Sequence, residues 1–187
     1  MSTVPNELDR RFRAAAAGEG LLDVGYDVLE SPVGPLLVAA TPRGVCRISY
    51  DADAEALAER LARLYGVRVL RAPSAVDAVR RELDEYFDGR RVTFGVALDL
   101  TAAPVFTRTV LDELARVPYG EVTTYGALAA RVGSPRAARA VGTVMNRNPI
   151  PIVLPCHRVV GSSGSLVGYA GGLDRKQALL RLEGARL

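Results

Sequence analysis

The chain is organised around the stretch Ile150-Pro151-Ile152-Val153-Leu154-Pro155-Cys156-His157-Arg158-Val159-Val160, which carries a cysteine and the only histidine at the end of an apolar run. The apolar residues predict a buried strand end. Pro151 and Pro155 cannot donate hydrogen bonds to a neighbouring strand, so we expect an irregular or edge-like segment rather than a central strand.

The adjacent cysteine and histidine are candidates for nucleophilic chemistry. A free thiol has a pKa of about 8.5, so roughly a tenth or less of it is thiolate near neutral pH. A neighbouring imidazole can take the thiol proton, and a carboxylate behind the imidazole would fix its tautomer. We therefore expect the pKa of Cys156 to lie below its free value. The alternative is a buried core thiol beside a surface histidine.

Several further motifs surround this pair. Upstream lie Ser134-Pro135-Arg136-Ala137-Ala138-Arg139-Ala140-Val141-Gly142 and Asn148-Pro149, and downstream lie Gly168-Tyr169-Ala170-Gly171-Gly172-Leu173 and Leu182-Glu183-Gly184. In this order and spacing they resemble the O6-alkylguanine-DNA alkyltransferase family, single-use proteins that remove alkyl groups from guanine. The resemblance is strong from about Val105 to the C-terminus and weak before Leu100. A motif such as Pro155-Cys156-His157-Arg158-Val159 inside a long matching segment is far more specific than a lone short motif.

The resemblance implies an α/β (α+β) chain of two domains. A flexible lead-in over residues 1–22 precedes an N-terminal ribonuclease H-like α/β domain over 23–100. A mostly helical, winged helix-turn-helix-like domain over 101–187 then carries the active cysteine and binds DNA. The 187 residues, 49% of them apolar, are enough for real cores.

Charge differs between the two halves of the chain. Residues 1–100 hold 13 Arg against 16 Asp and Glu, and residues 101–187 hold 11 Lys and Arg against 5 Asp and Glu. The basic C-terminal half favours a polyanion partner, with a solvated surface as the alternative. We see no apolar run long enough for a membrane span and no signal sequence, and two cysteines make no disulfide framework. We therefore expect a cytoplasmic protein with no membrane partner.

The N-terminal half reads as scaffolding. Three apolar runs separated by turn signals predict a meander of strands over 24–29, 36–40 and 45–50, after a short helix over 7–17. Alternation places Cys46, Ile48 and Tyr50 on one face, so we expect Cys46 in the core. Two amphipathic helices are predicted next. Asp53 can cap the first, whose inward face carries Leu57, Leu61 and Leu64, and Ser74 can cap the second, whose inward face carries Val76, Val79, Leu83 and Phe87. We expect a strand over 67–70 between the two helices and another over 92–98 after them. Some family members hold zinc here through Cys and His. With no histidine before residue 157, we predict no metal and no cofactor.

The C-terminal half predicts a helix-turn-helix. A first helix faces inward with Phe106, Val110, Leu114 and Val117. A second, capped by Thr124, ends at Gly133, and a third begins with Ser134 as cap and Pro135 in its first turn. As a bare pattern, about half of such helix pairs serve only to pack against each other. Here the third helix carries arginines, which can bind phosphate, and small residues, which let the backbone approach a partner closely. Asp174-Arg175-Lys176-Gln177 resembles a capping box opening a last helix that Gly184 closes.

The resemblance assigns roles to individual residues. A carboxylate at a helix C-terminus is unfavourable, so Glu183 invites another explanation, and the family supplies it: Glu183 holds His157, which directly or through a water activates Cys156. Asn148 matches a hinge that braces both neighbouring segments, with an ordinary Asn-Pro turn as the alternative. The expected catalytic residues are Cys156, His157, Glu183, Asn148 and Tyr125; the base-binding residues are Tyr125, Val159, Ala170, Tyr169, Met145, Pro151 and Lys176; the DNA-binding residues are Arg139, Arg136, Ser134, Ala137, Ala138 and Arg147.

The function implied is DNA repair by irreversible, stoichiometric transfer of the alkyl group from O6-alkylguanine in double-stranded DNA to Cys156, after base flipping from the minor groove. O4-alkylthymine is a second candidate substrate. The protein would act as a single-turnover methylated-DNA–protein-cysteine S-methyltransferase, a monomer that can cluster along DNA. An alternative is a non-catalytic, alkyltransferase-like damage sensor or regulator. Such proteins usually have tryptophan in place of the cysteine, whereas this chain has Cys156 and no tryptophan. A third alternative is a Cys-His hydrolase, which would need an oxyanion hole and would turn over repeatedly.

Overall fold

The structure is a computed structural model that describes residues 7, 11, 15–16, 18–51 and 53–186. Most of the helix expected over 7–17 lies outside the described residues. The chain forms two compact units, which we call unit 1 (Met1–Asp84 with Gly95–Ala102) and unit 2 (Glu85–Phe94 with Ala103–Leu187). None of the described helices is long and apolar enough to cross a membrane.

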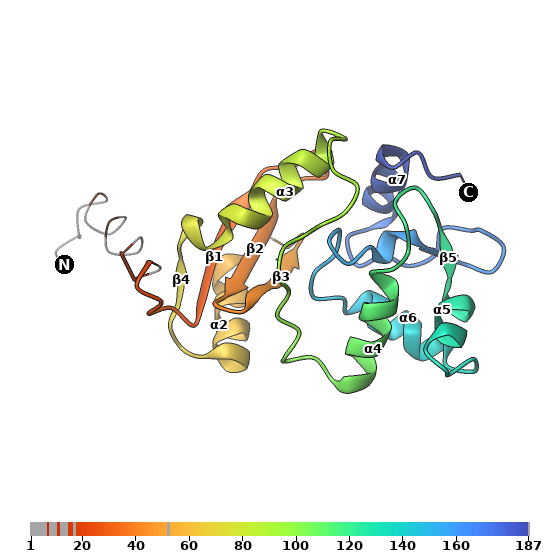
Figure 1. The fold of residues 1–187 in the computed structure, drawn as a ribbon, viewed down its shortest axis with the longest axis horizontal. Coiled ribbons are helices and arrows are strands. Elements are labelled where there is room, and N and C mark those ends of the chain that lie inside the picture. The colour runs from red at the N-terminus through yellow and green to blue at the C-terminus, as the bar shows by residue number, and fades with distance from the viewer. Residues whose placement is uncertain (1–6, 8–10, 12–14, 17, 52, 187) are drawn as a thin grey trace. The chain divides into compact units, whose positions relative to one another are not determined.

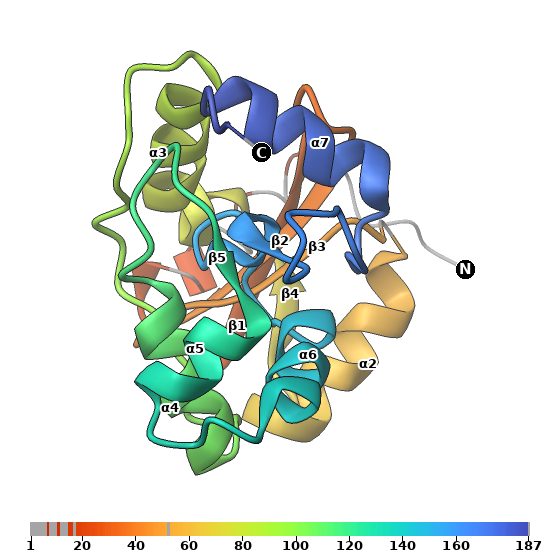
Figure 2. The ribbon, with the colours of Figure 1, turned by 90° about the vertical axis from the view of Figure 1, so that its right-hand side faces the viewer.

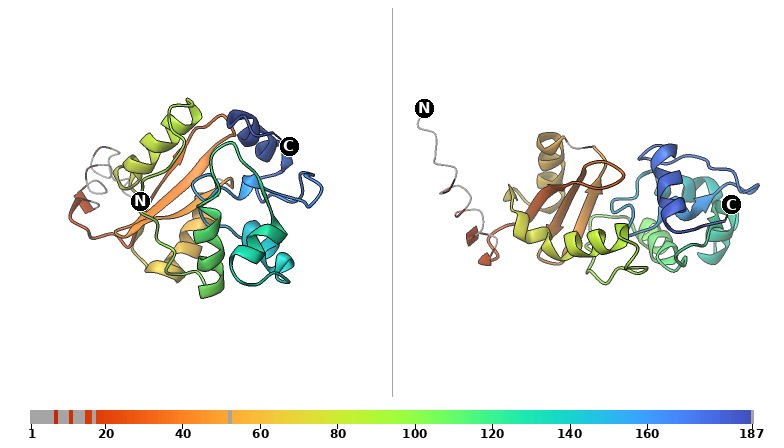
Figure 3. Two further views of the ribbon diagram at one scale, coloured as in Figure 1. Left: turned by 45° about the vertical axis from the view of Figure 1, so that its right-hand side comes forward. Right: turned by 90° about the horizontal axis from the view of Figure 1, so that it is seen from above.

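Unit 1 is built on a four-stranded sheet in the order β3-β2-β1-β4 (Figure 1). Its strands are β1 (Val24–Leu29), β2 (Leu36–Thr41), β3 (Gly44–Ser49) and β4 (Val69–Arg71). The first three pair antiparallel and confirm the predicted meander, while β4 runs parallel to β1. Helices α2 (Ala54–Tyr65) and α3 (Asp77–Phe87) lie on opposite faces of the sheet, and a 3-10 turn, η1 (Pro73–Val76), precedes α3 (Figure 3). Of the expected lead-in, Ala16 and Leu22 are buried against Ala72.

A β-bulge corrects the expected face of Cys46. The register of β2 and β3 shifts between Ala39 and Ala40, so Cys46 is an extra residue in the ladder. Cys46 therefore packs with Leu37 and Ala39 in the cluster under α2, whereas Ile48 lies opposite Val38 on the other face. Cys46 is nevertheless buried, as predicted.

The helix boundaries of unit 1 were partly predicted. Asp53 caps α2 by accepting a hydrogen bond from Ala56 N at 3.0 Å, but Leu64 is 59% exposed. Ser74 does not cap α3, because it lies inside η1. Near the end of α3 the fully buried side chain is Tyr86, and the expected Phe87 is only half-buried.

No strand forms over residues 92–98, contrary to the prediction, apart from an isolated bridge between Val45 and Leu98. The backbone N–H groups of Gly95 and Val96 instead donate to the carboxylate of Glu82, at 2.7 and 3.3 Å. These donors are therefore satisfied by a side chain and have no need of a ladder partner.

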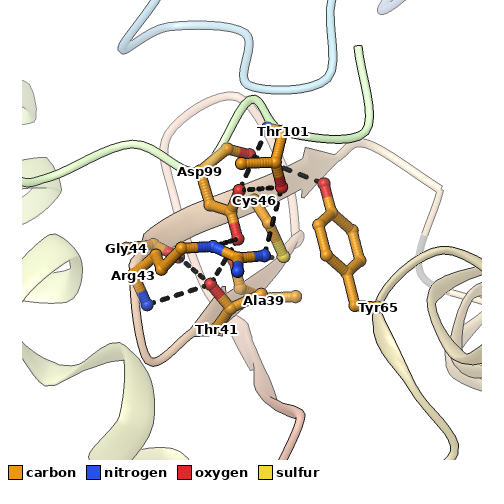
Figure 4. Close-up of polar contacts among 8 residues, drawn as sticks. All are labelled: Ala39, Thr41, Arg43, Gly44, Cys46, Tyr65, Asp99 and Thr101. Atoms are coloured by element: carbon orange, nitrogen blue, oxygen red, sulfur yellow. Dashed lines mark hydrogen bonds and ion pairs between the residues drawn. The ribbon is translucent and has the colours of Figure 1, made fainter.

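The buried carboxylate of Asp99 links three parts of unit 1 (Figure 4). Asp99 accepts hydrogen bonds from the hydroxyl of Thr41 at 2.6 Å, from Arg43 Nε at 3.0 Å and from Thr101 N at 3.0 Å. Burial alone would raise the pKa of Asp99, but the hydrogen bonds from Thr101, Thr41 and Arg43 outweigh it and lower the pKa. This carboxylate joins the end of β2, the turn after it and the chain leaving the unit.

Most of the regular elements of unit 2 are helices (Figure 2). The unit contains α4 (Val105–Leu114), β5 (Thr123–Thr124), α5 (Tyr125–Arg131), α6 (Ala138–Asn146), a 3-10 turn η2 (Cys156–Arg158), β6 (Val159–Val160) and α7 (Leu173–Leu182). Strands β5 and β6 pair in parallel, and α4, α5 and α6 pack against one another. The predicted helix-turn-helix is α5 and α6, with Thr124 capping α5 and Gly133 at a φ of 72° after it.

Three local expectations for unit 2 were wrong. Phe106, in the first turn of α4, is 38% exposed. The inward face of α4 is formed by Val110, Leu111 and Leu114. Ser134 and Pro135 form a turn closed by Ala137 N on Ser134 O at 2.8 Å, so α6 begins only at Ala138. Asp174 is in the first turn of α7 rather than at its cap, which is Gly172.

Replacement of Asp99 by alanine should lower the free energy of unfolding by about 2–3 kcal/mol, because Thr41 and Arg43 would lose a buried, charged acceptor. Urea denaturation measures this change. Glu59→Ala is the matched control in unit 1, since the pair of Glu59 with Arg63 is exposed at both ends and is worth at most about 1 kcal/mol. Equal losses in the two variants would contradict a stabilising role for the Asp99 cluster.

Candidate active site

The segment before Cys156 is held by one side chain. Asn148 Oδ1 accepts from Ile150 N at 3.1 Å, and its Nδ2 donates to Leu154 O at 2.8 Å. Between these two bonds Ile152 has a φ of 75°, a conformation that a β-branched residue rarely adopts. Asn148 thus spans a strained loop and braces both of its ends.

Cys156 and His157 lie in the 3-10 turn η2 and not in a strand. The strand β6 begins only at Val159. The expected irregular segment is therefore present, and the expected strand end is replaced by a turn that follows Pro155. Both side chains are buried, Cys156 at 4% exposure and His157 at 0%.

Glu183 is the common partner of the two residues that follow Cys156. His157 Nε2 lies 2.8 Å from Glu183 Oε1. Arg158 donates to both carboxylate oxygens, through Nε to Oε2 at 2.8 Å and through Nη2 to Oε1 at 2.9 Å. The side chain of Glu183 is fully buried and that of Arg158 is only 7% exposed, so this bidentate pair is shielded from solvent.

Sequence reasoning missed three contributors to this network. Arg158 is in the quoted stretch, but no role was assigned to it. Tyr86 donates its hydroxyl to Glu183 Oε1 at 2.7 Å, and Gly120 N donates to Oε2 at 3.3 Å. Tyr86 and Gly120 are 97 and 63 positions from Glu183, and no local signal connects residues at such separations.

The network keeps the carboxylate ionised. Burial alone would raise the pKa of Glu183, but hydrogen bonds and charge from His157 and Arg158 outweigh it and hold the pKa at about 2. For His157, burial lowers the pKa more than the bond to Glu183 raises it. The site therefore rests as an ionised Glu183–Arg158 pair beside a neutral imidazole.

A neutral His157 must carry its proton on Nε2, because Glu183 only accepts hydrogen bonds. Its Nδ1 is then the basic atom. Nδ1 is buried and makes no hydrogen bond with any described residue. An unpaired, buried lone pair on the imidazole is suited to accept a proton.

The thiol of Cys156 differs from the expectation of a lowered pKa. Burial raises the pKa of Cys156 to about 11, against smaller opposing effects of the Asn148 side chain and the positive charge of Lys176. The resting site is therefore a neutral thiol beside a neutral imidazole, and the thiolate forms only when the proton moves.

Several predicted base-binding residues gather beside η2. Lys176 is fully buried and donates from Nζ to Val159 O at 2.6 Å and to Val167 O at 3.0 Å. The hydroxyl of Tyr125 donates to the same Val167 O at 3.2 Å. Lys176 and Tyr125 thus hold the loop after β6. Of the remaining predicted residues, Met145 and Pro151 are buried, Tyr169 is half-buried and Ala170 is exposed.

The predicted DNA-binding residues lie around the start and end of α6. Arg136, Arg139 and Arg147 are exposed. A surface hollow of about 630 Å³ is lined by Ser134, Pro135, Arg136 and Ala137 in the turn before α6. Ala138 is the first residue of α6 and is half-buried. Within the described ranges, no group of three His, Cys, Asp or Glu side chains could hold a metal ion.

Comparison with known proteins gives consistent matches over both halves of the chain. Family models match the ribonuclease-like domain of 6-O-methylguanine DNA methyltransferase at residues 24–100 and its DNA binding domain at residues 105–185. The methylated-DNA--protein-cysteine methyltransferase of Methanosarcina barkeri is 40% identical over 161 residues, 84% of this chain and 96% of that protein. The protein of the same name from Mycobacterium leprae is 40% identical over 83% of this chain and 89% of its own length.

Solved structures agree with these relatives. The crystal structure of Mycobacterium tuberculosis OGT in complex with DNA has a TM-score of 0.75 and 38% identity, covering 86% of this chain and 92% of that one. The crystal structure of the O6-methylguanine methyltransferase of the same organism has a TM-score of 0.74 and 38% identity, over 86% of this chain and 93% of that one.

Fold, site and matches together define a class: a protein with a ribonuclease-like α/β part and a helix-turn-helix part that carries a buried cysteine beside histidine. The chain belongs to the 6-O-methylguanine DNA methyltransferase family. The predicted fold class and the predicted resemblance are both confirmed.

Alkylation of Cys156 by iodoacetamide should be slow at neutral pH, and its rate should rise with pH toward about 11. Burial raises the pKa of this thiol, and only the thiolate reacts. Mass mapping of the peptide that contains Cys156, over a series of pH values, measures the rate. Cys46 is the internal control, since burial raises its pKa to about 12. A plateau of Cys156 alkylation below pH 8.5 would contradict a thiol that rests in its neutral form.

Proposed function

We propose that this protein repairs DNA by transferring the alkyl group of O6-alkylguanine to Cys156, irreversibly and once per molecule, as a methylated-DNA–protein-cysteine S-methyltransferase. The observation that carries the proposal is the buried Cys156, followed directly by a buried His157 whose Nε2 is held by Glu183, in a unit that matches the family's DNA binding domain. The relatives named for this activity match across most of the chain.

The reaction is attack of sulfur on a saturated carbon. As the bond from Cys156 Sγ to the alkyl carbon forms, the bond from that carbon to guanine O6 breaks, and its electron pair stays with guanine. The thiol proton passes to His157 Nδ1, directly or through a water. Glu183 stabilises the resulting imidazolium through Nε2 at 2.8 Å. No reverse step is available, since no group at the site can break the thioether.

The departing guanine needs a proton as negative charge builds on its ring. We assign this donation to the hydroxyl of Tyr125, which in the free protein donates a hydrogen bond to Val167 O. The proton taken up by His157 then returns to Tyr125 through solvent, so that the net transfer is of the thiol proton to guanine. Val159, Ala170 and Tyr169 would contact the base, Met145 and Pro151 would line the pocket, and Lys176 would hold the loop that closes it. Asn148 positions Cys156 through the loop that it braces.

DNA binding is assigned to the helix-turn-helix. The exposed Arg136 and Arg147, the turn residues Ser134 and Ala137, and Ala138 at the start of α6 would contact the DNA backbone. Arg139 would enter the stack from the minor groove when the damaged nucleotide turns out. We retain O4-alkylthymine as a second candidate substrate.

The organisation of the protein is part of the proposal. We place the lead-in at residues 1–22, the N-terminal domain at 23–100 and the DNA-binding and transfer domain at 101–187. We expect a monomer that can cluster along DNA and a cytoplasmic location, where a reducing environment keeps Cys46 and Cys156 as free thiols.

Incubation with DNA that contains O6-methylguanine should add the mass of one CH₂ to the protein, mapped to the peptide that contains Cys156. Cys156→Ser should lose the transfer while retaining DNA binding, because the hydroxyl is a far weaker nucleophile than a thiol at this site. Cys46→Ser is the matched control and should transfer normally. Many methyl groups removed by one protein molecule would instead indicate hydrolysis or a turnover reaction.

Arg139→Ala should slow repair of duplex DNA at least about tenfold, because unstacking a base costs a few kcal/mol and the arginine would fill the vacated place. Reaction with free O6-benzylguanine needs no flipping and should be nearly unchanged. Arg136→Ala is the comparison: loss of a phosphate contact should lower the salt slope of binding by about one unit for all DNA. If Arg139→Ala slowed duplex and free base equally, Arg139 would support the pocket rather than replace the base.

A further inference from the structure

Tyr86 contacts the active-site network from a part of the chain far from the motif. It lies near the end of α3, in the segment Glu85–Phe94 that groups with unit 2 although the family's ribonuclease-like domain matches residues 24–100. The Tyr86 side chain is fully buried, and its hydroxyl lies 2.7 Å from Glu183 Oε1. The same oxygen lies 2.8 Å from His157 Nε2.

The ring of Tyr86 is held on several sides. Its centroid lies 5.3 Å from those of Phe87 and Phe94, and 6.1 Å from that of Tyr119 in an edge-to-face arrangement. The guanidinium of Arg158 lies 5.8 Å from the centroid of the Tyr119 ring. The aromatic neighbours hold the ring of Tyr86, and its hydroxyl donates to Glu183 Oε1.

The hydroxyl remains a donor at all working pH values. Burial raises the pKa of Tyr86, and the neighbouring charge of Glu183 raises it further. Glu183 is ionised and can only accept, so the direction of this hydrogen bond is unambiguous.

We propose that Tyr86 is a positioning residue for the alkyl transfer: its hydroxyl orients Glu183 and limits the negative charge that Oε1 presents to His157. The inference rests on the proposed function. Oε1 accepts from Tyr86, Arg158 and His157, so each donor shares the charge of one oxygen. The charged or titratable groups that face this site are Arg158 and Cys156 from η2, Lys176 from α7, Tyr86 from α3 and Tyr119 from the chain between α4 and β5.

Two substitutions at position 86 change the donor in opposite ways. Tyr86→Phe keeps the ring and removes the hydroxyl, which leaves more charge on Oε1 and makes His157 more basic. Replacement of Tyr86 by 3-fluorotyrosine keeps the ring and the hydroxyl but makes the hydroxyl a stronger donor, which makes His157 less basic. The base must be neutral to take the thiol proton, so its pKa sets the acid limb of the rate profile.

The test is the single-turnover rate of methyl transfer to Cys156 as a function of pH, together with the iodoacetamide rate of the same thiol. For Tyr86→Phe we expect an acid limb at higher pH and a plateau lowered by about tenfold, since hydrogen bonds to charged groups are among the stronger ones. For the fluorotyrosine protein we expect an acid limb at lower pH with a plateau within about twofold of wild type.

Tyr119→Phe is the matched control. Its hydroxyl donates to Leu182 O at 3.1 Å and not to the carboxylate, so its loss should leave the acid limb in place. The proposal is overturned if the acid limb of the rate profile stays at the wild-type pH in both position-86 proteins. It is equally overturned if the plateau rate falls while the acid limb does not move, because that result indicates that Tyr86 acts through packing alone. If Tyr86→Phe fails to fold, the fluorotyrosine protein decides. Absence of transfer by the wild-type protein would refute the proposed function instead, and the iodoacetamide profiles would still report on Tyr86.

Discussion

The candidate active site depends on one buried ion pair, between Glu183 at the end of α7 and Arg158 in η2. An isolated carboxylate in this position would be costly, because burial disfavours the charged form and the helix C-terminus adds negative potential. Two hydrogen bonds from Arg158, together with donors from Tyr86 and Gly120, satisfy both oxygens. With its charge balanced in this way, Glu183 can hold His157 in one tautomer without drawing a proton onto it.

That balance explains why the thiol can rest in its neutral form. A site with an unpaired Glu183 would favour an imidazolium and a thiolate as a standing pair. Here burial lowers the pKa of His157 and raises that of Cys156 to about 11, so in the proposed reaction the thiol must lose its proton as the sulfur attacks. A protein that acts once per molecule, as we propose, would gain from this arrangement, because a resting thiolate would react with other electrophiles before it met its substrate.

Local signals predicted most of the fold, and contacts between distant residues decided the remainder. The meander and the caps Asp53 and Thr124 follow from neighbouring residues alone. The bulge at Cys46 depends on the register against β2, and the absence of a strand over 92–98 depends on Glu82, so neither is visible in a local pattern. At the site, the motif and the resemblance pointed to Cys156, His157 and Glu183. They missed Tyr86 and instead predicted its neighbour Phe87 as the inward residue. Only the hydrogen bond to the distant carboxylate of Glu183 distinguishes Tyr86 from Phe87.

Arg158 shows why the motif must be read as a unit. His157 and Arg158 are consecutive in a single 3-10 turn, and both reach the same carboxylate. Arg158 also donates from Nη1 to Val117 O at 2.6 Å, which joins η2 to the chain after α4. A lysine could supply the charge but not three donors in one plane, so it would leave either an oxygen of Glu183 or the Val117 carbonyl without its partner. The arginine therefore determines the orientation of Glu183, and through Glu183 that of His157, the base that we propose for Cys156.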